Sequence, residues 1–447
     1  MNETRKLGFW ACVALVVGNI IGSGIFLLPA SLAPYGMNAL WGWLLTAAGS
    51  MTLALVFAAL SRAFPRAGGP QDYTAAAFGA PVSFVVVWSY WISNWIGNVA
   101  LATGAISYLS DALPPLADPR IAPWATLALI WILTTINAWG VHAASRVQVV
   151  STVLKIIPLL AVAGLGLWLL LSDHASTHAG THVAALTTTP FRLADITAAA
   201  TLTLWALNGF ESAAIVAPTI ADPERTIPRA SLFGVALAAA LYILTSTTVM
   251  VLVPAAQLGK SHAPFADAVA PFFGSASAHW VALFAAISCI GALNGWVFLN
   301  AQLTAYLARA GLFPARLGRD SSRGTPIAAL CLNSALTSAM LAMNYGKSLV
   351  AVFNFMILLS TTATLVMYLL CALAVLRLLQ RGVSIPGSTA ALALVGALGA
   401  AYALWALWGA GAQALLWGGA LLLAGLPVYF WMRRGRAGSG VPLHSGQ

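Results

Sequence analysis

Long apolar runs separated by short polar segments dominate the chain. About 20 apolar residues are needed for a helix to cross a bilayer. Twelve such runs occur, centred near Ile21, Leu53, Ile96, Ile132, Ala161, Ala206, Ile243, Ile290, Leu336, Leu359, Gly399 and Leu423. The segments between them are too short to hold a soluble domain. The pattern therefore predicts an all-α integral membrane protein with twelve transmembrane helices.

The first apolar run is interrupted at its middle. The stretch Gly18-Asn19-Ile20-Ile21-Gly22-Ser23-Gly24 places three glycines, an asparagine and a serine within seven residues. Glycine costs about 1 kcal/mol relative to alanine in a helix interior, and a freed backbone group in lipid must find a partner or line a cavity. A break here therefore predicts a polar transport site. A half-helix that starts at Ser23 and Gly24 directs its N–H groups toward an anion such as a carboxylate.

The sixth run has a second interruption, in which Asn208, Gly209 and Glu211 lie at membrane depth. Carbonyl groups freed near Ile20 and Asn208 can accept hydrogen bonds from an ammonium group. Breaks five spans apart predict an inverted repeat of five plus five helices with two helices appended. Because the two halves show no obvious identity, the repeat rests on the breaks alone. The expected divisions are a first repeat over 1–172, a second over 190–382, two appended helices over 388–433 and a disordered tail over 434–447.

Composition and charge agree with a membrane protein. Hydrophobic residues form 60% of the chain, charged residues form 7%, and the mean hydropathy is +0.87, whereas soluble domains carry about 25% charged residues. If the N-terminus is cytoplasmic, the alternating loops leave on the outer side only four of the 21 Lys and Arg residues, namely Arg120, Arg192, Lys260 and Lys347. The positive-inside rule then places both termini in the cytoplasm. The net charge of +10 needs no nucleic-acid partner, because these residues also contact anionic lipid headgroups.

The sequence indicates no metal, cofactor or enzymatic chemistry. Its four cysteines lie in apolar runs at no metal-ligand spacing and are interpreted as small buried residues. His174, His178 and His182 are spaced by four residues, but their loop is rich in Thr, Ala and Gly and has no strong helical signal. An enzyme would need a nucleophile and base or a metal cluster at membrane depth, and a channel would need rings of like residues from a symmetric oligomer.

Glu211 and Lys155 are the two charged residues predicted inside the membrane. Of the eleven acidic residues, Glu211 alone lies well inside a predicted span. A carboxylate there must pair, bind a proton or face water, so it is either a proton-coupling group or a structural acid kept neutral by a hydrogen bond. Lys155 lies nearer the cytoplasmic end of its run. It either extends toward the interface or acts as a fixed cation where a sodium ion would otherwise bind.

Aromatic and amide side chains near the breaks predict the walls of the site. Trp205, Asn208 and Glu211 follow at intervals of three residues and share a helix face. Trp296 follows Asn294-Gly295 in the eighth run, and Asn94 and Asn98 are one turn apart in the third. Tryptophan faces attract cations, and asparagine amides bond to a guanidinium, an ammonium or a carboxylate.

At these residues the chain resembles the amino acid–polyamine–organocation superfamily. It is most similar to the bacterial arginine/agmatine antiporters and their lysine/cadaverine and ornithine/putrescine relatives. The resemblance covers nearly the whole chain, and it is carried by residues 18–29, 95–100, 203–213, 222–228 and 311–314. It implies a bacterial inner-membrane transporter, often homodimeric, that exchanges an amino acid for its decarboxylated amine.

The resemblance also implies roles for individual residues. Ser23 and Gly24 would bind the substrate carboxylate, and the main chain at Ile20, Trp205 and Asn208 would bind the α-amine. Trp296 would stack on the substrate side chain, and Asn98 would bond to its head group. Trp205 would form the external gate. Glu211 with Tyr368 would form the cytoplasmic gate and supply the proton-linked acid. Tyr90 and Ser360 also match pocket or gate positions.

Four positions differ from the arginine antiporters. Asn208 replaces an aliphatic residue, Asn94 a small one, and Leu101 a methionine that lines the pocket. Lys155 resembles the lysine of proton-coupled and light-chain-type amino-acid transporters in the same superfamily. The main hypothesis is therefore an antiporter for a cationic amino acid and its amine. The alternative is a proton-coupled or exchange transporter of neutral amino acids.

Overall fold

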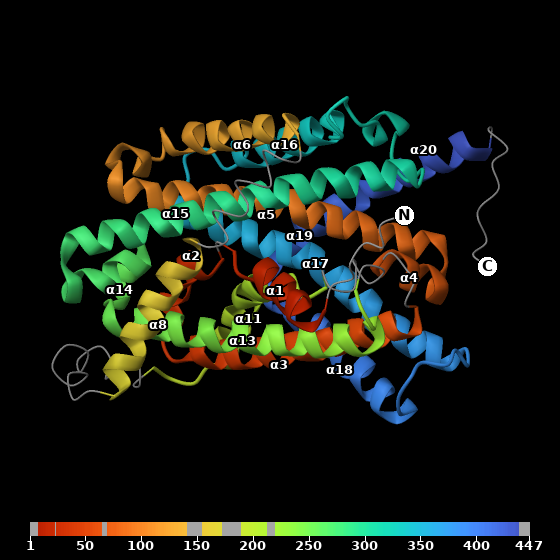
Figure 1. Ribbon diagram of the computed structural model, residues 1–447, viewed down its shortest axis with the longest axis horizontal. Helices are drawn as coiled ribbons and strands as arrows, with labels where there is room; N and C mark the ends of the chain where they lie inside the picture. The colour runs from red at the N-terminus through yellow and green to blue at the C-terminus, as the bar shows by residue number, and fades with distance from the viewer. Residues whose placement is uncertain are drawn as a thin grey trace.

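The computed structural model describes residues 8–22, 24–64, 69–140, 154–171, 189–211 and 220–437, which form helices joined by turns (Figure 1). The helices of the first half are α1 (Phe9–Ile20), α2 (Gly24–Leu32), α3 (Asn38–Ala63), α4 (Pro70–Phe78), α5 (Ala80–Ala112), α6 (Ala122–Ala138) and α8 (Ile156–Leu171). Those of the second half are α11 (Leu193–Leu207), α13 (Pro223–Leu252), α14 (Ala255–Leu258), α15 (Pro264–Arg309), α16 (Ile327–Ala342), α17 (Leu349–Gln380), α18 (Thr389–Gly409), α19 (Gly411–Leu423) and α20 (Gly425–Ala437).

The long helices run side by side in layers (Figure 1). Helices α6 and α16 cover α5 and α15 on one side of the molecule, and α3 and α13 form the opposite side. The short helices α1 and α11 lie between these layers, with α1 against α13 and α11 against α3. The two interrupted helices therefore occupy the centre of the protein.

The helices agree with the predicted apolar runs, although the number of spans stays a prediction. Among the described residues, six helices are long and apolar enough to cross a membrane, and the bent pair α1 and α2 would add a seventh. Four shorter helices, α6, α8, α11 and α16, are also apolar. Each predicted centre lies in a helix or, for Ile21, between α1 and α2.

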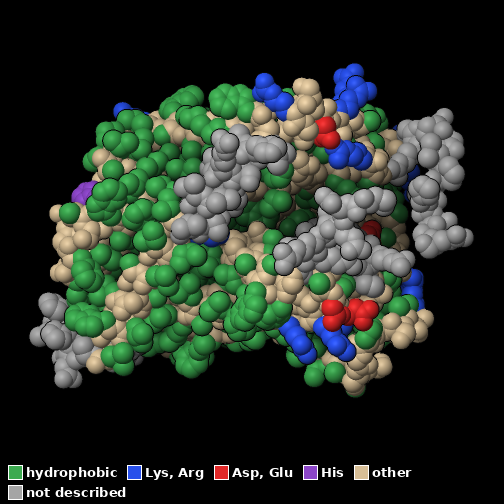
Figure 2. Space-filling model, in the orientation of Figure 1, with side chains coloured by type: hydrophobic (Ala, Val, Ile, Leu, Met, Phe, Trp, Pro, Cys, Tyr) green, Lys and Arg blue, Asp and Glu red, His purple; other side chains and the backbone are tan. Residues whose placement is uncertain are grey.

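The surface shown in Figure 2 is largely apolar, as expected for a protein in contact with lipid. On this face, Lys and Arg side chains gather at the end of the molecule where α4 and α20 lie. At that end Arg381 at the end of α17 donates a hydrogen bond to the Ala76 carbonyl of α4, with an N–O distance of 3.0 Å. The grouping of basic residues at one end is what the charge pattern of the sequence predicts.

Candidate functional site

The first helix breaks where the glycine-rich motif predicts it. Helix α1 ends at Ile20, Ile21 is extended (φ −71°, ψ 97°), and α2 begins at Gly24 with its axis turned by 46°. The carbonyls exposed by the break have partners from other helices. The Tyr242 hydroxyl of α13 donates to Ile20 O at 2.9 Å. The break is thus held open by side chains that satisfy its backbone.

Lys155 supplies two more of these partners. Its Nζ donates to Gly18 O at 2.6 Å and to Ile21 O at 3.0 Å, and the residue is only 5% exposed. The side chain is therefore directed into the break of the first helix and does not extend toward a membrane interface. It joins the start of α8 to the last turn of α1 and to the first residue of the break.

The second helix breaks at the predicted asparagine and glycine. Helix α11 ends at Leu207, Asn208 is extended (φ −63°, ψ 149°), and Gly209 has φ +118°. A Cβ atom on Gly209 would lie 3.0 Å from the Asn19 carbonyl carbon and 3.2 Å from Ile20 N. Only glycine combines this positive φ with so close an approach. The two breaks therefore touch through their backbones.

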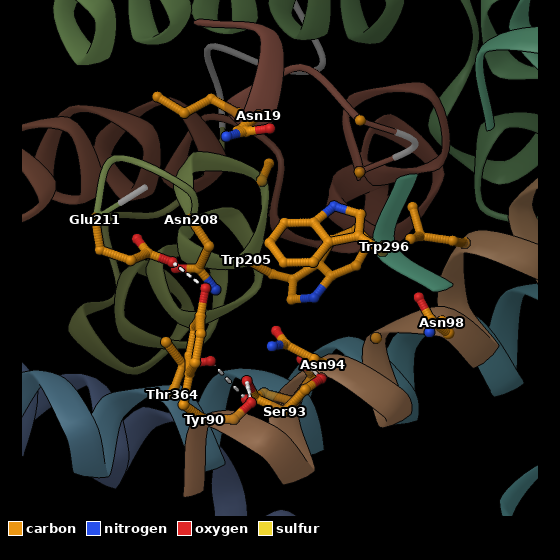
Figure 3. Close-up of a pocket in the computed structure, with 17 residues that line it drawn as sticks. Asn19, Tyr90, Ser93, Asn94, Asn98, Trp205, Asn208, Glu211, Trp296 and Thr364 are labelled. Carbon is orange, nitrogen blue, oxygen red and sulfur yellow. Dashed lines mark hydrogen bonds between the residues drawn. The ribbon is translucent and has the colours of Figure 1, made fainter. Parts of the chain in front are cut away.

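A pocket lies beside the two breaks (Figure 3). It contains about 540 Å³ of space not filled by atoms, part of it open to solvent. The predicted residues that line it are Ile20, Gly24, Tyr90, Asn94, Asn98, Leu101, Trp205, Asn208, Glu211, Trp296 and Ser360. Of the other predicted residues, Tyr368 contacts Glu211 from outside the lining, Lys155 lies at the break, and Ser23 is outside the described residues.

Aromatic rings and amide groups both line this pocket. In Figure 3 the indoles of Trp205 and Trp296 overlap in the view, and Asn94 and Asn98 lie on α5. Trp205 meets Phe353 of α17 edge to face with ring centroids 5.8 Å apart, and its ring would lie 2.9 Å from a Cβ on Gly24. Asn98 is 2% exposed, and its Oδ1 has no hydrogen-bond partner among the described residues. This oxygen is free to accept a bond from a ligand.

Glu211 lies at one end of the pocket, surrounded by hydroxyl donors. Its Oε2 accepts from the Tyr368 hydroxyl at 2.9 Å and from Gly209 N at 3.1 Å. Its Oε1 accepts from the Tyr90 hydroxyl at 3.4 Å, the bond drawn dashed in Figure 3. Glu211 is 1% exposed, and no Lys or Arg in the described part of the chain forms an ion pair with it. The acid is held in place by neutral groups.

A second aromatic cluster joins α2, α5 and α15. The Tyr108 hydroxyl of α5 donates to Phe26 O of α2 at 2.7 Å and accepts from Phe265 N of α15 at 3.3 Å. The rings of Phe26 and Phe265 meet edge to face with centroids 5.2 Å apart. All three residues are at most 1% exposed. On the face in Figure 2 the surface is hollowed between the α5–α15 layer and the α3–α13 layer.

Several residues at the pocket and at the breaks were not predicted from the sequence as part of the site. Asn19, Ser93 and Thr364 also line the pocket. Asn19 lies inside the interrupted motif and Ser93 precedes Asn94, so both had a local signal. Tyr242 had none, because only the folded structure shows which carbonyl its hydroxyl reaches.

The sequence predicts no metal site at the cysteines or at the three spaced histidines. Among the described residues no group of three or more His, Cys, Asp or Glu side chains can hold a metal ion. Three cysteines are buried, but Cys331 is exposed, so the prediction that all four are buried is wrong at this position. The side chain faces outward from an apolar helix, which in lipid costs a cysteine little. His174, His178 and His182 lie outside the described residues.

Sequence comparison identifies the family. A family described as "Amino acid permease" matches residues 7–432. The chain belongs to the amino acid permease family. The permease is 35% identical over 347 residues to the cadaverine/lysine antiporter of Escherichia coli (strain K12), covering 77% of this chain and 76% of the relative. It is 30% identical over 429 residues to the putrescine transporter PotE of the same strain, covering 96% of each chain.

Membership of this family agrees with the architecture. The permease is an integral membrane transport protein whose two interrupted helices meet at a polar pocket. Backbone that leaves the helix at membrane depth is tolerated only where it is buried in protein or lines a cavity. The breaks at α1–α2 and at the end of α11 are buried in protein and also line the pocket.

Proposed function

We propose that this permease is a secondary antiporter that exchanges a cationic amino acid, such as arginine, lysine or ornithine, for the corresponding amine. The observation that carries the proposal is the charge of the pocket. Its described lining contains one carboxylate, Glu211, together with four asparagines and two tryptophans, and no Lys or Arg. Such a lining offers acceptors and aromatic faces to a cation. The names of the two relatives, which specify lysine, cadaverine and putrescine, support the same substrate class.

The substrate backbone would be read by the two breaks. The N-terminus of α2, beginning at Gly24 with Ser23 before it, would hold the carboxylate through backbone N–H groups. The carbonyls of Ile20, Trp205 and Asn208 would accept bonds from the α-amine. Ile20 O already accepts from Tyr242, but a carbonyl oxygen has a second lone pair for this purpose.

The substrate side chain would extend along the face formed by Trp296, Leu101 and Asn98. Trp296 would stack on a guanidinium or on an alkyl chain with its ammonium. The free Oδ1 of Asn98 would accept a bond from the head group. Ser360 would act mainly as a structural residue, because its hydroxyl donates to Ser93 O at 2.8 Å and so joins α17 to α5 at the pocket wall.

Alternating access would move the central helices relative to the α5–α15 layer. Trp205 with Phe353 would close the external side, and Glu211 with Tyr90 and Tyr368 would close the cytoplasmic side. We assign proton coupling to Glu211. A carboxylate with only neutral partners at membrane depth is stable as the protonated acid, and it can ionise when a cation or water enters.

The fixed ammonium of Lys155 gives this transporter independence from sodium. Its Nζ occupies the space between Gly18 O and Ile21 O, where a metal cation would otherwise bind the carbonyls of the broken helix. The same contact, together with Asn94 and Asn208 in the pocket, favours a second candidate function. This is proton-coupled or exchange transport of a neutral amino acid.

We also propose that the permease lies in a bacterial inner membrane with both termini in the cytoplasm. The five-plus-five repeat and its divisions are part of the same proposal. A homodimer is a further expectation from the family. The outward residues of the last helices, including Trp408, Leu416 and Leu423, are more than 60% exposed. Such apolar surface fits either lipid or a second copy of the chain.

Counterflow in proteoliposomes tests the substrate class. Vesicles containing the purified permease are loaded with arginine, agmatine, lysine, ornithine or alanine, and uptake of labelled arginine is followed with and without a pH gradient. Exchange of arginine for a cationic internal substrate supports the proposal. Uptake of labelled alanine or leucine without arginine exchange would reject it and leave the neutral carrier as the function.

A further inference from the structure

Asn208 connects the pocket to the buried acid. Its backbone ends α11 at the second break, and its half-buried side chain lines the pocket. Its Oδ1 lies 3.4 Å from the Tyr368 hydroxyl, and that hydroxyl lies 2.9 Å from Glu211 Oε2. Figure 3 shows Asn208 beside Glu211, between the acid and Trp205. One hydroxyl therefore lies between an amide oxygen that faces the substrate space and the carboxylate.

A tyrosine hydroxyl has one proton to donate and can also accept. When Glu211 is ionised, the short contact assigns the Tyr368 proton to the carboxylate, and Asn208 Oδ1 is left to accept a bond from a ligand. When Glu211 is protonated, its own O–H can donate to the Tyr368 oxygen. The Tyr368 proton is then available to Asn208 Oδ1. The amide oxygen is free in one protonation state and occupied in the other.

We propose that Asn208 is a positioning residue that couples substrate binding to the proton on Glu211, because the Tyr368 hydroxyl and a substrate ammonium compete for its Oδ1. The inference rests on the proposed function, since it assigns a mechanism to the same pocket. Two donors on one oxygen weaken each other, so a substrate ammonium and a proton on Glu211 then oppose each other through Asn208 Oδ1. Linkage requires the effect to be reciprocal, so substrate entry promotes proton release and proton binding promotes substrate release.

Among the described residues, no other charged group near Glu211 takes part in this exchange. The ionisable side chains that interact with it are Tyr90 on α5 and Tyr368 and Cys371 on α17. On α3, Phe57 contacts the rings of Phe210 and Tyr368. Of these side chains, only that of Tyr368 is placed to reach both Glu211 and Asn208.

The test is the pH dependence of substrate affinity. Binding of labelled L-arginine to the purified full-length permease is measured between pH 5 and pH 8, where the arginine ammonium and guanidinium stay charged. Wild-type affinity is expected to fall as the pH is lowered. Asn208→Leu is expected to bind roughly three- to tenfold more weakly at high pH, the usual range for one lost hydrogen bond, and to approach wild type at low pH. The ratio of arginine affinity at pH 8 to that at pH 5 is therefore smaller for Asn208→Leu than for wild type.

Two further variants separate coupling from loss of a pocket amide. Asn98→Leu removes another pocket amide that makes no hydrogen bond to Tyr368 or Glu211, so it should weaken binding at every pH and keep the wild-type ratio. Tyr368→Phe should reduce the pH ratio as Asn208→Leu does, and the double variant should reduce it no further. Asn208→Ser provides the same comparison if the leucine variant is poorly folded.

The outcomes distinguish this inference from the proposed function. A wild-type ratio in Asn208→Leu and Asn208→Ser, or additive effects of Asn208→Leu and Tyr368→Phe, would overturn the coupling role. If the wild-type permease does not bind arginine, the cationic substrate class is wrong. The coupling is then measured in the same way with L-alanine, whose α-ammonium is equally charged over this pH range.

Discussion

Substitution of Gly209 by alanine tests whether the contact between the two breaks builds the site. The residue has φ +118°, a sparsely populated conformation that costs an L-residue about 1–3 kcal/mol. The new Cβ would also lie 3.0 Å from the Asn19 carbonyl carbon and 3.1 Å from its oxygen. These are backbone atoms, which cannot move aside without shifting α1. We expect a total loss of about 2–4 kcal/mol of stability and loss of substrate exchange.

Gly164 provides the matched control. It lies within helix α8, and a Cβ there meets no atom within 4 Å. Alanine at this position should be neutral or stabilising by up to about 1 kcal/mol, because glycine is the poorer helix former. Thermal unfolding in detergent and exchange in proteoliposomes are measured for both variants. If Gly209→Ala were as stable and as active as Gly164→Ala, the close contact of the two breaks would not be needed for the site.

Two further substitutions test other parts of the account. Lys155→Met removes the hydrogen bonds to Gly18 O and Ile21 O. Bonds from a charged donor contribute about 1.5–3 kcal/mol each, partly offset by the cost of burying the charge, so we expect a net loss of about 2 kcal/mol in a melting assay. A variant as stable as wild type would show that Lys155 does not hold the break. Trp296→Ala should weaken arginine binding roughly tenfold, given about 1–2 kcal/mol for a desolvated cation–π contact, and alanine binding much less. Equal losses for the two ligands, measured by competition, would remove the stacking role.

The positions of the breaks and most residues of the pocket could be predicted from the sequence. Glycine, asparagine and serine at the middle of an apolar run leave backbone groups that lipid cannot satisfy, so the composition itself locates the interruptions. Asn94, Asn98, Asn208 and Trp296 all line the pocket, as the sequence predicts. Local chemistry was sufficient for these positions.

The partners across the structure could not be predicted in the same way. Nothing in the sequence shows that Tyr242 reaches Ile20 O or that Tyr108 joins Phe26 to Phe265, since these contacts depend on how distant helices cross. The sequence also did not indicate the change of direction at Gly274, where φ is +79° within α15. The sequence left two roles open for Lys155, extension toward the membrane interface or a fixed cation at a sodium position. Its apolar run does not show which way the side chain points.

The central claim is that Glu211, at the junction of the two broken helices, links a proton to the substrate site. The most direct measurement is arginine–agmatine exchange by wild type and Glu211→Gln in proteoliposomes over a range of pH, with arginine binding measured in parallel. The account predicts that wild-type exchange depends on pH. It also predicts that the Gln variant binds arginine but shows either no exchange or exchange that does not vary with pH. Exchange by Glu211→Gln with the wild-type pH profile would contradict it.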